Sequence, residues 1–164
     1  MGDYWDEQFE TMPWKDLHKY WLDRFNQLLS YVKSNSDFYE KHLEKIRAVS
    51  SFEELTALPV MTKSEIREAQ SAGSRNAPLG TIQAARTEDI VQVISSSGTT
   101  GRPVYYGVTR KDLESWRDAL AAFTYNAGIR KNDIVGHVVG IPIFAGGEPY
   151  FEGMRHIGAT VVWA

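Results

Sequence analysis

The sequence contains no cysteine. A disulfide framework and a metal site built from thiolates are therefore excluded. The absence of cysteine also fits the reducing cytoplasm, which is the compartment that we expect for this protein. No apolar run approaches the roughly 20 residues of a membrane-spanning helix, and the acidic start of the chain is unlike a signal peptide. We therefore expect no membrane partner.

Basic side chains are also few. Eighteen Lys and Arg stand against 21 Asp and Glu, which gives a net charge of −3, and no basic run could follow a phosphodiester backbone. We therefore expect no nucleic-acid partner. Four histidines are present, but no two have the spacing of metal ligands, so we predict no structural metal site.

The first half of the chain is rich in helical patterns. Apolar residues recur at spacings of three and four from Trp14 onwards, which predicts a long helix ending near Asn35. The stripe consists of Leu17, Trp21, Phe25, Leu28, Leu29 and Val32. A second helix is expected to begin at Ser36, whose short side chain can cap it. His18 and His42, on these two helices, are expected to face solvent.

Helix-capping patterns continue along this half. Ser51-Phe-Glu-Glu54 and Thr62-Lys-Ser-Glu65 both have the spacing in which a cap hydroxyl and a carboxylate satisfy each other's backbone amides. The segment from Ser71 to Thr81, with two glycines and a proline, is expected to be a loop. Residues 1–85 therefore read as an N-terminal helical region.

Residues 86–164 read as an α/β region. The predicted order is strand 90–95, strand 103–108, a helix opened by the pattern of Thr109 and Asp112 and closed by Gly128, strand 133–139, a short helix to His156, and strand 159–163. The first two strands form a β-hairpin, and the rest form a parallel βαβ layer. A parallel sheet needs cover on both faces, so we expect an incomplete N-terminal portion of a larger fold, in which both regions belong to one domain.

Between the hairpin strands lies a loop with five hydroxyl side chains and two glycines, Ser95-Ser-Ser-Gly-Thr-Thr-Gly-Arg102. Glycine lets a backbone approach a phosphate closely, hydroxyls and amides can donate to its oxygens, and Arg102 adds positive charge. A Ser or Thr hydroxyl can also ligate Mg²⁺. An ordinary polar turn has the same composition, and such turns are far more common than phosphate loops, so composition alone favours the turn.

Ser96-Ser-Gly-Thr-Thr-Gly-Arg-Pro103 resembles the phosphate-binding signature of the adenylate-forming superfamily of acyl-CoA synthetases. Within it, the chain is similar to the phenylacetate–coenzyme A ligases. The further motifs that follow this family's order are Leu58–Arg67, Gly107–Leu113, Ala127–Asp133, Phe144–Gly147 and Ile157–Thr160. The resemblance implies two steps, in which a carboxylate attacks ATP to give an acyl adenylate and the thiol of coenzyme A then displaces AMP. It also implies Mg²⁺.

The resemblance implies two sets of site residues. The residues that would hold the phosphates are Ser96, Ser97, Gly98, Thr99, Thr100, Gly101 and Arg102. The candidate walls of an acyl pocket are Ile141, Pro142, Phe144, Ala145, Gly146 and Gly147. Glu148 stands where the family leads us to expect a small residue, and it could narrow or polarise the pocket. No catalytic residue can be assigned, because the family's catalytic lysine lies in a later domain.

The expected function is that of the N-terminal part of an ATP-dependent acyl- or aryl-CoA ligase, with a small aromatic or acyl carboxylate as substrate. Because this chemistry needs elements from a longer chain, we expect the 164 residues alone to be inactive. Two alternatives remain open. One is a short, non-catalytic nucleotide-binding module. The other is an interaction domain that self-associates through an exposed sheet edge near Val161 and Val162.

Overall fold

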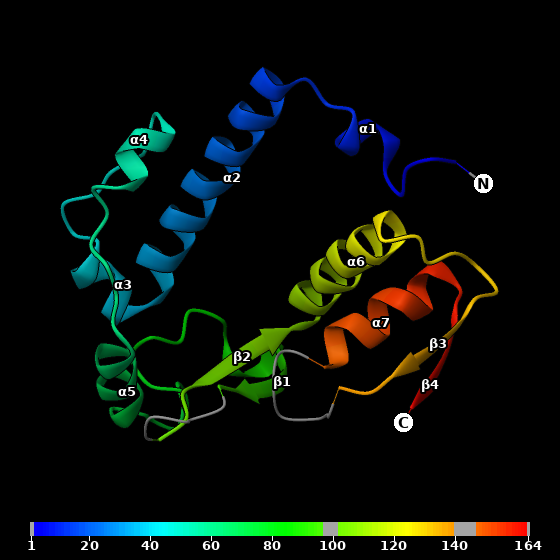
Figure 1. The fold of residues 1–164 in the computed structure, drawn as a ribbon. Coiled ribbons are helices and arrows are strands. Elements are labelled where there is room, and N and C mark those ends of the chain that lie inside the picture. Colours follow the sequence, from blue (N-terminus) through cyan, green and yellow to red (C-terminus); the bar gives the residue numbers. More distant parts are fainter. Residues whose placement is uncertain (1, 97–101, 140–146, 164) are drawn as a thin grey trace. The chain divides into compact units, whose positions relative to one another are not determined.

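A computed structural model of the chain describes residues 2–96, 102–139 and 147–163. It forms two compact units (Figure 1). The helical unit comprises residues 12–90, and the α/β unit comprises residues 1–11 together with residues 91–164. The predicted division at residue 85 stays a prediction, but the first eleven residues join the α/β unit rather than the helices.

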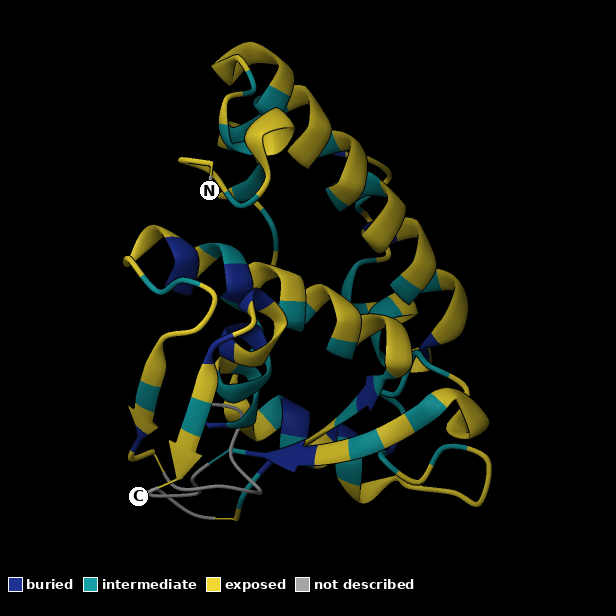
Figure 2. Ribbon diagram, turned by 90° about the vertical axis from the view of Figure 1, so that its right-hand side faces the viewer, coloured by how far each residue is buried: buried dark blue, intermediate teal, exposed yellow. Residues whose placement is uncertain are grey.

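The helical unit begins with α2 (Trp14–Asn35), which has the predicted bounds. All of its residues are described, and Leu29 alone is buried, so most of this helix is exposed or intermediate in Figure 2. The predicted start of the next helix, α3 (Asp37–His42), is confirmed. The Ser36 hydroxyl accepts from the backbone N–H of Tyr39 at 3.3 Å and donates to the carbonyl of Thr81 at 2.8 Å. One buried hydroxyl thus caps α3 and fixes a segment 45 residues away.

The two predicted caps downstream differ in outcome. Thr62 and Glu65 form the predicted reciprocal pair at the start of α5 (Lys63–Ser71). The same prediction for Ser51 and α4 (Phe52–Leu55) is wrong, because the Ser51 side chain makes no cap hydrogen bond. The carboxylate of Glu54 instead accepts from the backbone N–H and the hydroxyl of Ser50, both at 2.8 Å.

The prediction that His18 faces solvent is also wrong. Its ring lies 4.1 Å from that of Trp14 and 4.6 Å from that of Phe52, measured between centroids. His42 stacks on Phe38, at 5.1 Å and an interplanar angle of 16°. Both imidazoles are half-buried and pack against aromatic rings. The sequence did not predict these contacts, because both histidines have charged neighbours in the chain.

The α/β unit carries the strands. Its elements are α1 (Glu7–Glu10), β1 (Ile90–Ser95), β2 (Tyr105–Thr109), α6 (Arg110–Asn126), β3 (Ile134–His137), α7 (Glu148–Ile157) and β4 (Thr160–Trp163). A short 3₁₀ turn (Thr87–Asp89) leads into β1. β1 and β2 form one two-stranded sheet, with their arrows in opposite directions in Figure 1. β3 and β4 form a second sheet and are parallel, with Ile134 opposite Thr160 and His137 opposite Trp163. The predicted hairpin and parallel layer are therefore present.

The core of this unit lies between α6 and α7. Ala121, Tyr125 and Ile157 form a buried cluster, against which Trp5 and Ile129 pack. The capping pair of Thr109 and Asp112 opens α6 as predicted. Gly158 closes α7 in the left-handed conformation, with φ of 97°. The helix is thus limited to ten residues, and β4 begins two residues later.

The N-terminal segment docks on the end of α6. The Tyr125 hydroxyl donates to the carbonyl of Gly2 at 2.6 Å, and the Asn126 amide donates to the Glu10 carboxylate at 2.9 Å. The Trp5 ring lies 5.8 Å from that of Tyr125 and 5.2 Å from that of His156. These contacts place residues 2–10 in the α/β unit. No helix among the described residues combines the length and apolar character needed to cross a membrane.

Candidate functional site

The hydroxyl-rich loop begins at the end of β1, and the structure describes its two ends. Ser96 and Arg102 are described, whereas Ser97, Gly98, Thr99, Thr100 and Gly101 lie outside the described residues. The backbone N–H of Ser96 donates to the carbonyl of Val104 at 2.9 Å. The N–H of Val104 donates to the Ser96 hydroxyl oxygen at 3.1 Å. These two bonds join the ends of the loop.

The base of the loop is buried. Val104 has no exposed surface, and Ile94 and Ser95 are each 5% exposed. Arg102, by contrast, is exposed at the end of the loop. Buried residues at the base and a cation at the end of the loop are the arrangement that a cradle for an anion needs, because the backbone is fixed while the charge stays accessible.

The second predicted set follows β3. Ile141, Pro142, Phe144, Ala145 and Gly146 lie outside the described residues. Gly147 is described, is buried, and stands at the N-cap of α7. Its carbonyl accepts from the N–H of Phe151 at 3.4 Å, the first hydrogen bond of the helix. The structure therefore assigns Gly147 a place at the start of a helix and leaves the pocket wall a prediction.

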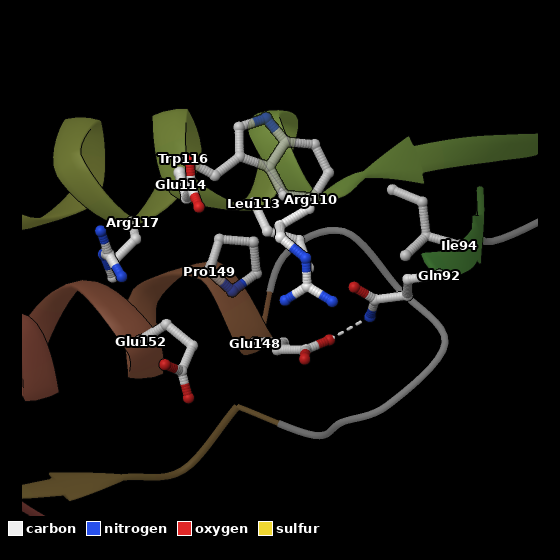
Figure 3. Close-up of a pocket in the computed structure, with 10 residues that line it drawn as sticks. All are labelled: Gln92, Ile94, Arg110, Leu113, Glu114, Trp116, Arg117, Glu148, Pro149 and Glu152. Atoms are coloured by element: carbon white, nitrogen blue, oxygen red, sulfur yellow. Dashed lines mark hydrogen bonds between the residues drawn. The ribbon is translucent and has the colours of Figure 1, made fainter. Parts of the chain in front are cut away.

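Glu148 makes a contact that the sequence did not predict. Its carboxylate oxygen Oε2 accepts a hydrogen bond from the side-chain amide of Gln92, on β1. Figure 3 shows this bond as a dashed line, with the Arg110 side chain directed towards the same carboxylate. The helix that follows the predicted acyl wall is thus bonded to the strand that leads into the predicted phosphate loop.

These side chains border a cavity of about 230 Å³ between β1 and the first turns of α6 and α7 (Figure 3). Its lining residues are Gln92, Ile94, Arg110, Leu113, Glu114, Trp116, Arg117, Glu148, Pro149 and Glu152. The lining thus combines apolar side chains with charged ones of both signs. No sequence signal marks this cavity, because its residues come from three separate segments and follow no motif.

His137 lies at the carboxyl end of β3 and is 5% exposed. Its ring meets that of Trp163 edge-on at 4.9 Å and lies 6.3 Å from that of Phe151. No described residue offers its Nε2 atom a hydrogen-bond partner. Within the described ranges, no three His, Asp or Glu side chains are grouped as metal ligands would be.

No protein-family model matches the chain. Solved structures and curated sequences do. The architecture is that of the N-terminal portion of adenylate-forming CoA ligases. It is similar to 2-hydroxyisobutyryl-CoA ligase in complex with 2-HIB-AMP and CoA, with a TM-score of 0.86 and 29% identity, covering 98% of this chain and 34% of that one. An open conformation of that ligase gives a TM-score of 0.85, 26% identity, and coverage of 99% and 38%.

The sequence is similar, in particular, to phenylacetate–coenzyme A ligases. The ligase of Thermus thermophilus is 28% identical over 159 residues, which cover 94% of this chain and 34% of that enzyme. The ligase of Pseudomonas putida is 29% identical over 160 residues, which cover 95% and 35%. The predicted resemblance to this family is confirmed. The chain spans about a third of the length of the curated relatives that it matches.

Proposed function

We propose that this chain supplies the N-terminal part of an ATP-dependent CoA ligase. In the first step a carboxylate oxygen attacks the α-phosphorus of ATP, the bond to the β-phosphate oxygen breaks, and pyrophosphate leaves. In the second step the thiolate of coenzyme A attacks the acyl carbon, and AMP leaves with the bonding electrons. The observation that carries the proposal is the loop at residues 96–102, closed at its base by Ser96 and Val104, in a fold shared with ligases solved with an acyl adenylate.

The loop would hold the β- and γ-phosphates of ATP. Glycines at positions 98 and 101 permit close approach, Thr99 and Thr100 offer donors, and Arg102 adds a fixed positive charge that disperses the charge of departing pyrophosphate. A loop hydroxyl, such as that of Thr99 or Thr100, would help to hold Mg²⁺, which would supply positive charge against the phosphates. Because the Ser96 hydroxyl already accepts from Val104, Ser96 has the role of shaping the loop in this proposal.

The substrate would be a small carboxylic acid. An aromatic acid is favoured by the sequence similarity to phenylacetate–coenzyme A ligases, whereas the structurally similar 2-hydroxyisobutyryl-CoA ligase is in complex with 2-HIB-AMP. Residues 141–147 would form part of the acyl wall. A cytoplasmic location remains the prediction from the sequence.

The test is exchange of radiolabelled pyrophosphate into ATP, dependent on added acid, with the longest polypeptide that the source organism makes from this sequence. We expect exchange in the wild type and a loss of about 100-fold or more when Thr99→Ala and Thr100→Ala are combined, because both changes remove donors to the phosphates. Ser115→Ala, which removes an exposed hydroxyl on α6, is the control and should leave the rate unchanged.

Wild-type exchange in the double variant would show that the loop is not the phosphate site. Saturable binding of Mg·ATP without any exchange by the wild type would instead favour the alternative, a nucleotide-binding module without catalysis. Titration calorimetry with the same protein separates these outcomes.

A further inference from the structure

The hydrogen bond between Gln92 and Glu148 joins two segments that are 56 residues apart in the chain. Gln92 lies on β1, four residues before Ser96, where the predicted phosphate loop begins. Glu148 is the first residue of α7 and directly follows Gly147, where the predicted acyl wall ends. Both side chains are half-buried. The bond therefore links the strand before the predicted phosphate loop to the helix after the predicted acyl wall.

The carboxylate of Glu148 is suited to stay in place. It belongs to the first turn of a ten-residue helix, where unpaired N–H groups favour a negative charge. Pro149 fixes the backbone at the helix start, since its φ angle is restricted to helical values. Arg110, which lines the same cavity, points towards the carboxylate (Figure 3). A partly buried, charge-assisted hydrogen bond in such surroundings is stronger than an exposed one.

We infer that Gln92 and Glu148 form a positioning pair, which sets the distance between the phosphate loop and the acyl wall. The inference rests on the proposed function and adds residues that touch neither nucleotide nor acid. Adenylation requires the carboxylate oxygen to lie about 3 to 3.5 Å from the phosphorus that it attacks. β1 leads into the predicted phosphate loop, and α7 follows the predicted acyl wall. The distance between β1 and α7 must therefore stay fixed during the reaction.

The identity of residue 148 supports this role. The Glu148 side chain is long enough to reach the amide of Gln92 on β1, which a small side chain could not do. Glu148 thus adds a hydrogen bond between α7 and β1. Glu152, one turn further along α7, lines the same cavity but pairs with Arg155 of its own helix at 3.0 Å. The variant Glu152→Ala is therefore a matched control, because it also removes one carboxylate from α7, but one that pairs with Arg155 rather than with β1.

The experiment measures pyrophosphate exchange and melting temperature for Gln92→Ala, Glu148→Ala, the double variant, Glu148→Gln and Glu152→Ala, in the full polypeptide. We expect each alanine variant of the pair to lose about tenfold in the maximal rate, because a small displacement of reacting groups is costly. The KM for ATP should change little, and each variant should remain folded at the assay temperature, which the melting temperature checks. The double variant should be no slower than either single one, because both remove the same bond.

Glu148→Gln keeps an oxygen that can accept from Gln92, so it should recover most of the rate. Glu152→Ala should match the wild type. Additive losses in the double variant, wild-type rates in both single variants, or an equal loss in Glu152→Ala would each overturn the positioning role while leaving the proposed function intact. An inactive wild type would overturn the proposed function and this inference with it.

Discussion

Gly153, on α7, lies directly against the backbone of α6. A Cβ atom at this position would lie 2.6 Å from the carbonyl carbon of Leu120 and 2.7 Å from its Cβ. Because the nearest obstacle is backbone, no side-chain rotation can relieve the contact. We expect Gly153→Ala to lower the free energy of unfolding by about 1–3 kcal/mol, as overpacking of a core does. Urea denaturation followed by circular dichroism measures this loss.

Gly136 provides the control for that prediction. It lies on β3, and no described atom is within 4 Å of the position that a Cβ would occupy. Gly136→Ala should therefore leave the free energy of unfolding unchanged or slightly raised, because alanine reduces the entropy of the unfolded chain. If both variants lost the same free energy of unfolding, the contact between α7 and α6 would not be the reason why residue 153 must be glycine.

Single residues also show where sequence reasoning about the site stops. The sequence predicted a hairpin around the loop, and the bonds between Ser96 and Val104 agree with that hairpin. The phosphate site itself stays a prediction. The bond between Gln92 and Glu148 could not be expected, because it depends on how α7 packs against β1. Asn26 is a similar case. Its side-chain amide donates to the carbonyl of Val49 and accepts from the N–H of the same residue, and no local sequence pattern predicts these two bonds.

At the scale of elements, α5 depends on its capping pair. The Thr62 hydroxyl accepts from the N–H of Glu65, and the Glu65 carboxylate accepts from the hydroxyl and the N–H of Thr62. Thr62→Ala should cost roughly 1 kcal/mol of stability. Ser64→Ala, at an exposed position of the same helix, should cost nothing. Thermal melting of the three proteins compares them, and equal stabilities would mean that the cap contributes nothing.

The same pair gives α5 a dependence on pH. Hydrogen bonds from the side chain and then the backbone of Thr62 lower the pKa of Glu65 below its ordinary value. A folded-state pKa below the unfolded one stabilises the protein above the unfolded pKa, and this stabilisation is lost as the pH falls through the folded pKa. We therefore expect Thr62→Ala to raise the pKa of Glu65, which an NMR titration of its side chain measures. An unchanged pKa would contradict the assigned cause.

Element boundaries were predictable to the extent that they depend on local chemistry. The period of α2 and the caps of α3, α5 and α6 are all local, and their starts agree with the sequence. The failure at Ser51 has a physical cause. Ser50 and Ser51 both precede α4, and the Glu54 carboxylate accepts hydrogen bonds from Ser50. The spacing of Ser51 and Glu54 does not predict which of the two neighbouring serines bonds to the carboxylate.

At the scale of the whole molecule, the β3–β4 pair leaves apolar side chains uncovered. Ile134 is 77% exposed, Val138 76% and Val162 50%. Such residues beside an unpaired strand edge favour association between copies. We expect the 164-residue chain to show a mass that rises with concentration in analytical ultracentrifugation, and Val162→Lys to reduce this rise. A mass that stays constant across the concentration range would contradict the prediction.

The docking of Trp5 and Gly2 on Tyr125 has a consequence for the synthesis of the protein. Residues 2–10 leave the ribosome before their partners on α6, which follow more than one hundred residues later. Translation proceeds at roughly 5–20 residues per second, so the N-terminal segment waits for several seconds without its partners. The helical unit, which is continuous in sequence, can fold during that interval. Residues 2–10 therefore find their native contacts only after α6 has been made.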